Sequence, residues 1–169
     1  YNSYNIYFMQ KKLYFFLSLI FYFSLANSQN LSPNLTGNFT FTPESPLDDK
    51  PVEVYFHIPS GDITTMPILF SFHGASRNAD DYRDFWIDLA NDNNFIVIAP
   101  KFSDDYYPGL GDDYLMGNVY IDGDNPTPQT RNPENEWTFS VIDPLFDLIV
   151  NDINGTQTGY KAWGHSGGA

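Results

Sequence analysis

The chain has 169 residues, of which 21 are acidic and 8 are basic, and it carries a formal net charge of −13. Such an acidic surface repels phosphate backbones, so we expect neither nucleic acid nor an anionic membrane as a partner. The chain contains no cysteine, which excludes a disulfide scaffold and a lipid anchor on cysteine, and its stability therefore depends on a packed core.

Residues 1–28 are interpreted as eight upstream residues followed by a secretory signal that begins at Met9 and is cleaved before Gln29. A short basic start after Met9 leads into the apolar run 13–25, and Ala26 and Ser28 are the small residues expected before a cleavage site. A transmembrane anchor is the alternative, but this run falls short of the roughly 20 residues that cross a bilayer. We therefore expect an exported protein, secreted or periplasmic, with no stable membrane association after signal cleavage.

Residues 29–51 are rich in Asn, Ser, Thr and Pro and are predicted to be a leader or linker. An edge strand is expected around residues 38–42. Asn30, Asn34 and Asn38 each begin a glycan acceptor pattern, but such matches are common in an Asn-rich chain and matter only in a eukaryotic secretory route.

The next elements alternate between strand and helix patterns. Val52–Ile58 alternates like a half-buried strand, and Ile68–Phe72 is a nearly continuous apolar run typical of a strand buried on both faces. Asn78 can cap a helix over 79–91, and the buried strand 95–99 follows, ended by a proline. This order indicates an α/β fold with a mostly parallel sheet. The apolar face of the helix is expected to comprise Phe85, Trp86, Leu89 and Ala90.

Residues 101–136 form a long irregular stretch with many Asp and Gly residues. Because it leaves the carboxyl end of a strand, where open α/β sheets bind ligands, we expect a loop over the mouth of a site. A helix is predicted over 137–153 with a kink at Pro144, and residues 159–163 are predicted to form the next strand.

That last strand leads into Gly164-His165-Ser166-Gly167-Gly168, which matches the GxSxG pattern. In a nucleophile elbow this serine lies on a sharp strand-to-helix turn that tolerates only small neighbours. The alternative is a glycine-rich turn with a solvated serine. The strand and helix patterns that precede the motif favour the elbow and Ser166 as its nucleophile.

Acyl transfer by a serine also needs two backbone N–H donors for the developing oxyanion. One candidate is Gly167, directly after the nucleophile at the start of a helix. The other is Ala75, in the sequence His73-Gly74-Ala75-Ser76 that follows a buried strand. Both residues act through the backbone, so their side chains are free to vary.

None of the three histidines suits the role of general base. His57 lies within a strand, His165 adjoins the serine, and His73 closes a strand at the oxyanion loop, where we expect it to brace the loop. The chain order Ser, acid, His places both missing partners after the serine. Asp143 and Asp147 are then surface acids of a helix. We therefore expect the chain to be the first half of a larger domain, without turnover by itself.

We expect no metal and no cofactor. Asp122-Gly123-Asp124-Asn125 superficially resembles a calcium loop, but Pro126 stands where the next ligand is needed. No His and Glu pair at helical spacing indicates zinc.

Segments 72–80, 95–100, 132–138 and the terminal elbow together resemble the α/β-hydrolase superfamily, and in particular secreted polyhydroxybutyrate depolymerase-like and feruloyl-esterase-like members. The resemblance covers residues 52–169. It implies an α/β-hydrolase fold truncated after the elbow, with Ser166 as nucleophile and Ala75 and Gly167 as oxyanion donors.

The predicted organisation is therefore upstream residues plus a signal peptide over 1–28, a leader or linker over 29–51 and the N-terminal half of a hydrolase domain over 52–169. The resemblance implies a secreted serine hydrolase that cleaves small-molecule or polymeric carboxylic esters through an acyl-enzyme. Two alternatives stay open. One is a serine peptidase on the same scaffold, and the other is a non-catalytic secreted binding module.

Overall fold

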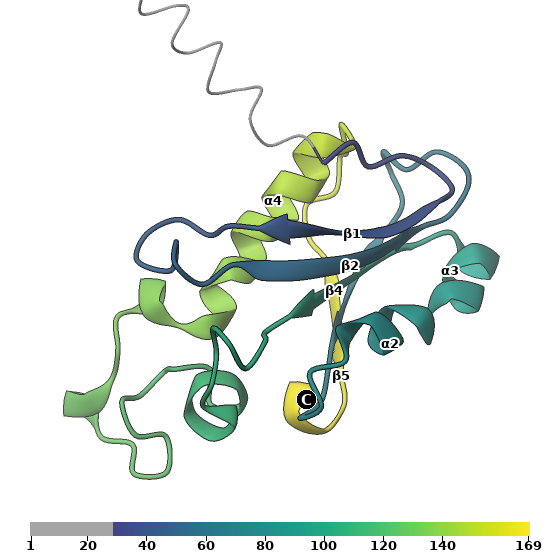
Figure 1. Ribbon diagram of the computed structural model, residues 1–169. Helices are drawn as coiled ribbons and strands as arrows, with labels where there is room; N and C mark the ends of the chain where they lie inside the picture. Colours follow the sequence, from purple (N-terminus) through teal and green to yellow (C-terminus); the bar gives the residue numbers. More distant parts are fainter. Residues whose placement is uncertain (1–28) are drawn as a thin grey trace, which may run out of the picture.

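The fold is organised around a mixed sheet. The computed structural model describes residues 29–169, so the predicted signal region lies outside the described residues. Within the described part, five strands lie in the order β1-β2-β4-β3-β5 (Figure 1). Their bounds are β1 Leu35–Phe41, β2 Val52–Ile58, β3 Ile68–Phe72, β4 Ile96–Lys101 and β5 Lys161–Gly164.

The strand directions bring two chain segments together at one edge. β1, β2 and β4 pair antiparallel, whereas β3 pairs parallel with β4 on one side and with β5 on the other. The β3–β5 ladder ends with Phe72 opposite Gly164, the last residue of each strand. The segments that follow β3 and β5 therefore leave the sheet side by side, at the edge where α/β folds place their sites.

The sequence predicted the strands closely. β2 and β3 have the expected bounds, and the expected edge strand is β1, which begins at Leu35 and pairs with β2. The prediction that Pro100 ends the next strand was wrong, because β4 continues through Pro100 to Lys101. β3 pairs with β4 only as far as Ile98, so this proline lies past the last pair with β3 and is tolerated there.

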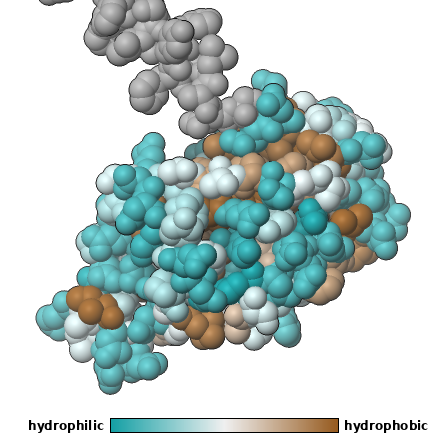
Figure 2. All heavy atoms as spheres, viewed as in Figure 1, coloured by the Kyte–Doolittle hydropathy of each residue, from teal (hydrophilic) through white to brown (hydrophobic). Residues whose placement is uncertain are grey.

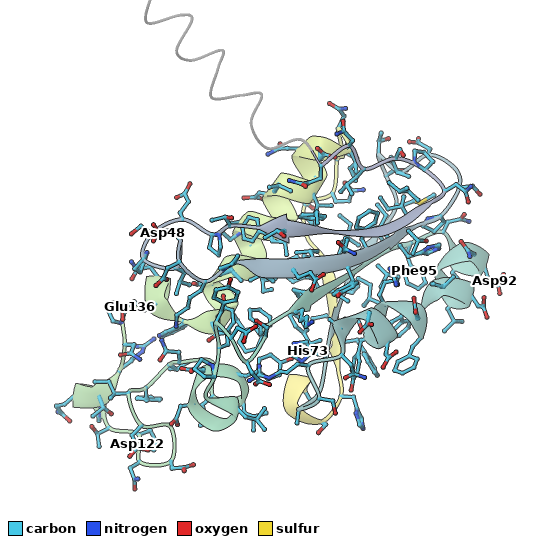
Figure 3. The ribbon with its side chains drawn as sticks, viewed as in Figure 1. Asp48, His73, Asp92, Phe95, Asp122 and Glu136 are labelled. Carbon is cyan, nitrogen blue, oxygen red and sulfur yellow. The ribbon has the colours of Figure 1, made fainter. Side chains whose placement is uncertain are left out.

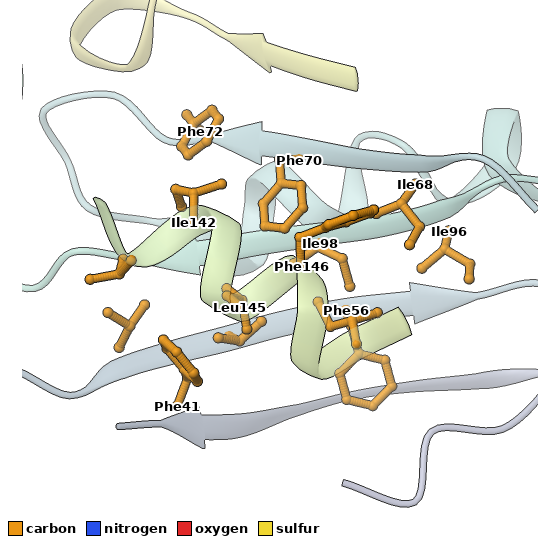
Figure 4. Packing of buried hydrophobic residues seen from close by; sticks show 14 of the residues in the cluster. Phe41, Phe56, Ile68, Phe70, Phe72, Ile96, Ile98, Ile142, Leu145 and Phe146 are labelled. Atoms are coloured by element: carbon orange, nitrogen blue, oxygen red, sulfur yellow. The ribbon is translucent and has the colours of Figure 1, made fainter. Parts of the chain in front are cut away.

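One face of the sheet packs against helix α4, Ile142–Asp152, which follows a 3-10 turn, η4, Thr138–Val141. The helix pattern over 137–153 is thus confirmed in two parts. Pro144 lies in the first turn of α4, where backbone N–H groups have no intrahelical partner, so the kink expected of a proline inside a helix is not required. Figure 4 shows this helix over the buried side chains of the sheet. The helix contributes Ile142, Leu145, Phe146 and Ile149 to the core, and the sheet contributes Phe56, Ile68, Phe70, Phe72, Ile96 and Ile98.

Two short helices, α2 Ala79–Asp84 and α3 Ile87–Asn93, replace the single helix predicted over 79–91. They pack against β2, β3 and β4. Asn78 precedes α2 without a capping bond to the backbone; its side-chain amide donates to the Asp81 carboxylate at 2.7 Å instead.

The predicted apolar face of this helix was also wrong. Phe85 is 66% exposed and Leu89 is 51% exposed, and of the four residues expected on that face only Ala90 is buried. Trp86 lies at the break between α2 and α3, and its indole N–H donates to Ser71 Oγ at 3.1 Å. The Trp86 side chain thus binds the buried hydroxyl of Ser71 in β3. The apolar periodicity of residues 79–91 does not identify the side of the two helices that is buried.

Residues 102–137 contain short turns rather than long elements. These are a π-helical turn, η1 Leu110–Leu115, and two 3-10 turns, η2 Pro128–Thr130 and η3 Glu134–Glu136, with a single bridge between Tyr120 and Arg131. Figure 1 shows η1 beside the elbow that follows β5, and the two are in contact. The far part of the segment, marked by Asp122 in Figure 3, lies away from the elbow.

The face shown in Figure 2 is mainly hydrophilic, with small hydrophobic patches at its margins. No helix among residues 29–169 is both long enough and apolar enough to cross a bilayer.

Candidate active site

Ser166 lies at a sharp turn directly after β5. Its φ of 56° places it in the left-handed region, which is uncommon for a residue with a side chain and is a recurrent feature of strained functional turns. The residue is exposed, and Ser166–Gly168 form one 3-10 turn, η5. The serine is therefore presented to solvent at the edge of the sheet, as an elbow requires.

Close backbone contacts explain two glycines of the motif. A Cβ atom on Gly164 would overlap the carbonyl group of Gly168. A Cβ atom on Gly168 would lie 2.5 Å from the Phe72 carbonyl oxygen and 2.6 Å from that of His73. Both positions exclude a side chain, because real Cβ atoms do not approach other atoms this closely. The turn is thus folded tightly on itself and packed against the end of β3.

The loop after β3 lies against the same turn. A Cβ atom built on Gly74 would lie 3.5 Å from Ser166 Cβ, and one built on Gly167 would lie 3.4 Å from the backbone nitrogen of Ala75. The structure thus brings together the three residues predicted from the sequence, Ser166, Ala75 and Gly167. Within residues 29–169, neither Ala75 nor Gly167 donates its N–H to another backbone group. Their role as oxyanion donors stays a prediction.

His73 holds this loop through both ring nitrogens. The ring is fully buried, Nδ1 lies 2.8 Å from the Gly74 carbonyl oxygen, and Nε2 lies 3.0 Å from the backbone nitrogen of Phe102. Only a neutral imidazole with its proton on Nδ1 can donate to the first and accept from the second. Burial disfavours the imidazolium and lowers the pKa of His73 to about 4.

The bond to Gly74 also fixes the candidate oxyanion donor. The Gly74 carbonyl and the Ala75 N–H belong to one planar trans peptide and point in opposite directions. The Gly74 oxygen accepts from His73 Nδ1 and also from the backbone N–H of Arg77 at 3.2 Å. Its orientation therefore sets the direction of the Ala75 N–H, so His73 acts as a brace, as expected, rather than as a base.

The segment after β4 anchors the loop from the other side. Tyr114 is fully buried, its hydroxyl donates to the His73 carbonyl oxygen at 2.6 Å, and its ring stacks on the imidazole with centroids 4.5 Å apart. Burial also raises the pKa of the Tyr114 phenol, which keeps it a proton donor. No spacing in the sequence pointed to this contact, which spans 41 residues of chain.

Arg77 is a second anchor that the sequence did not reveal. It is only 5% exposed and has a φ of 56°, and it donates to the carbonyl oxygens of Phe102 at 2.7 Å and Tyr107 at 2.9 Å. Its guanidinium lies over the Tyr114 ring, 4.6 Å from the centroid. The Asp104 carboxylate is 3.2 Å from Nε, close enough for an ion pair but not aligned for a hydrogen bond. The loop after β3 is thus bound to the segment after β4 by the charged guanidinium and by its stacking on Tyr114.

The other two histidines lie where their contacts are structural. His57 is buried in β2, with Nδ1 2.7 Å from Thr36 Oγ1 and Nε2 2.9 Å from Asn91 Oδ1. His165 is exposed, and its Nδ1 lies 3.3 Å from the Tyr82 hydroxyl. In the part of the chain that is described, none of the three histidines hydrogen-bonds to the serine.

The remaining acidic candidates have local roles. Asp143 and Asp147 are exposed on α4, and Asp143 accepts a hydrogen bond from Tyr160 at 2.8 Å. Asp122 accepts the backbone N–H groups of Asp124 and Asn125, an arrangement that closes a turn. Among residues 29–169, no group of three or more His, Cys, Asp and Glu side chains is placed to hold a metal ion.

The strand order, the tight serine turn after β5 and the loop packed against it after β3 define an α/β-hydrolase fold. Comparison with solved structures supports this class. The chain is similar to poly(aspartic acid) hydrolase-1 from Sphingomonas sp. KT-1, with 35% sequence identity and a TM-score of 0.67 over 82% of this chain and 48% of that one.

It is also similar to the poly(3-hydroxybutyrate) depolymerase LpqC from Bordetella parapertussis, with 25% identity and a TM-score of 0.71 over 85% of this chain and 47% of that one. An acetyl xylan esterase from Aspergillus awamori, at 14% identity and a TM-score of 0.55 over 79% of this chain and 43% of its own, shares the fold alone. The chain thus spans about half the length of these structures. No protein-family model and no curated protein sequence matches it.

Proposed function

We propose that the protein is an exported serine hydrolase that cleaves carboxylic esters through an acyl-enzyme on Ser166. The observation that carries the proposal is the packing of the exposed, left-handed Ser166 against the loop that holds Ala75. The similar poly(3-hydroxybutyrate) depolymerase acts on a polyester, which fits an ester substrate. Export rests on the signal pattern of residues 1–28.

The proposed chemistry runs in two steps. The Ser166 hydroxyl attacks the ester carbonyl, the N–H groups of Ala75 and Gly167 stabilise the oxyanion, and the alcohol leaves. Water then attacks the acyl-enzyme and releases the acid. A general base and an orienting acid are also required, and the described histidines do not supply the base, because none of them hydrogen-bonds to the serine.

An amide hydrolase on the same scaffold is the second candidate. It is favoured by the similarity to poly(aspartic acid) hydrolase-1, since poly(aspartic acid) is a polyamide. The elbow and the two oxyanion donors would serve both reactions.

The experiment that tests the nucleophile is labelling of the full-length protein with a fluorophosphonate. We expect labelling that is lost in Ser166→Ala and kept in Ser76→Ala, a matched exposed serine in the loop after β3. Persistent labelling of Ser166→Ala would overturn the proposal. Rates on a p-nitrophenyl ester and a peptide anilide then separate the two candidate reactions, and we expect the ester to be preferred.

A further inference from the structure

An apolar side chain lies directly beside the proposed oxyanion site. A Cβ atom built on Gly167 would lie 2.8 Å from Leu115 Cδ2, so this methyl group packs on the residue that follows the proposed nucleophile. Leu115 ends η1 and is nevertheless 48% exposed, and its neighbour Met116 is 43% exposed. One side of Leu115 thus covers the elbow and the other faces solvent, next to the proposed oxyanion donor Gly167.

The position of Leu115 is fixed relative to the oxyanion loop. The preceding residue, Tyr114, is fully buried and bonds to the His73 carbonyl oxygen, as described above. Figure 3 shows η1 next to the labelled His73 and the elbow. Because Tyr114 is held in the core, Leu115 is a preorganised wall of the site and not the tip of a free loop.

The segment that carries this wall is strongly acidic. Residues 102–130 contain six Asp and no Lys, Arg or His. Two cations lie near the oxyanion loop. Arg77 is buried, and its charge is directed at backbone carbonyls of this segment and at the Asp104 carboxylate, whereas Lys101 forms an ion pair with Glu53. Asp112 and Asp113 directly precede Tyr114 and Leu115 in the chain, so a polyanion approaching this wall meets like charges, and salt screens this repulsion over about 8 Å at physiological ionic strength.

We infer that Leu115 is a specificity-determining residue, and that the site takes esters whose group beside the scissile carbonyl is uncharged and apolar. By the same argument, the acidic segment 102–130 disfavours anionic substrates, including poly(aspartic acid). This inference rests on the proposed function and assigns the substrate class of that same site.

Two substrates of equal chain length test it in the full-length protein. These are p-nitrophenyl hexanoate and the mono-p-nitrophenyl ester of adipic acid, whose acyl chain has the same length but ends in a carboxylate. We expect kcat/KM to be about tenfold higher for the hexanoate at low salt, and the ratio to shrink as added salt screens the repulsion. Equal rates on the two esters would overturn the inference.

Variants of Leu115 then locate the contact. Leu115→Ala should lower kcat/KM for the hexanoate about fivefold, with a much smaller effect on p-nitrophenyl acetate, whose acyl group is too short for the contact. Leu115→Lys should raise the rate on the adipate ester relative to the hexanoate, a gain that a misfolded protein cannot imitate. Ile121→Ala is the control, since Ile121 is 70% exposed on the same segment and lies beside Asp122, at the end away from the elbow.

The outcomes separate this inference from the proposed function. If no ester is hydrolysed and fluorophosphonate does not label Ser166, the proposed function fails. If labelling and hydrolysis occur but Leu115→Ala and Ile121→Ala have the same chain-length and charge preference, the inference about Leu115 alone fails.

Discussion

The buried, neutral His73 should make the stability of the fold depend on pH. Its pKa is lowered from 6.5 to about 4 by burial, so between these values the unfolded chain carries one proton on this ring that the folded chain lacks. The free energy of unfolding then rises with pH across this window and falls as the solution is acidified. One pKa unit corresponds to about 1.4 kcal/mol, so the loss on going from neutral pH to about pH 4 is about 3 kcal/mol.

The test compares the full-length protein with its His73→Gln variant, in which this position cannot titrate and the side-chain oxygen can still accept the Phe102 N–H. Urea unfolding followed by tryptophan fluorescence gives the free energy of unfolding at several pH values between about 7 and about 4. The free energy of unfolding of the unsubstituted protein should exceed that of the His73→Gln variant most at neutral pH, and this difference should be about 3 kcal/mol smaller at about pH 4. The carboxylates titrate in both proteins, so their contribution cancels in the difference. If the free energies of unfolding of the two proteins had the same dependence on pH, His73 would not be a buried neutral imidazole, and its hydrogen bonds to Gly74 and Phe102 would be refuted with it.

Three further changes and one control variant probe the loop after β3 and the serine turn packed against it. Tyr114→Phe removes the hydroxyl that donates to the His73 carbonyl and should cost about 1 kcal/mol in urea unfolding; an unchanged midpoint would contradict the bond. Arg77→Met leaves the Phe102 and Tyr107 carbonyls without their donor and should lower the free energy of unfolding by about 3 kcal/mol in the same measurement. Asp104→Asn changes a mostly exposed partner of Arg77 and should lower it much less. Gly168→Ala places a methyl group against two carbonyl oxygens of the β3 end and should reduce the fluorophosphonate labelling rate at least about tenfold, so a normal rate would show that the turn is not packed as described.

The sheet could be predicted from the sequence because its strands carry their own signals. Ile68–Phe72 is apolar except for Ser71, and a short, mostly apolar run of this length is typical of a strand buried on both faces. The glycines around Ser166 predicted the elbow for a similar reason, since the close contacts that require them lie within the turn and at the adjoining end of β3.

The helix after the oxyanion loop was harder to predict. Apolar periodicity placed Phe85 and Leu89 on the buried face, but both are exposed. The local pattern shows which residues are apolar enough to be buried, whereas tertiary packing decides which of them are buried. Here Ser71, a polar residue inside a buried strand, donates to the Tyr82 carbonyl and accepts from the Trp86 indole, and this pairing accompanies the break between α2 and α3.

The bracing of the oxyanion loop could not be predicted, because the partners are far apart in the chain and have no motif. His73 bonds to Phe102 and Tyr114, which lie 29 and 41 residues away in a segment without regular elements. Only the length and position of that segment indicated a role at the site.

Two adjacent residues of this segment have different roles, and the effects of substituting them can be measured separately. Tyr114 faces inward and binds the carbonyl of His73, whereas Leu115 faces outward over the elbow. A change at Tyr114 alters the loop that carries the proposed oxyanion donor Ala75, which would serve every substrate, so it should lower kcat for all esters by a similar factor. A change at Leu115 alters a contact that only longer acyl groups make, so it should change the ratio between substrates. If Tyr114→Phe changed the chain-length preference as strongly as Leu115→Ala does, the segment would act as one movable unit, and the rigid wall argued from its buried tyrosine would be wrong.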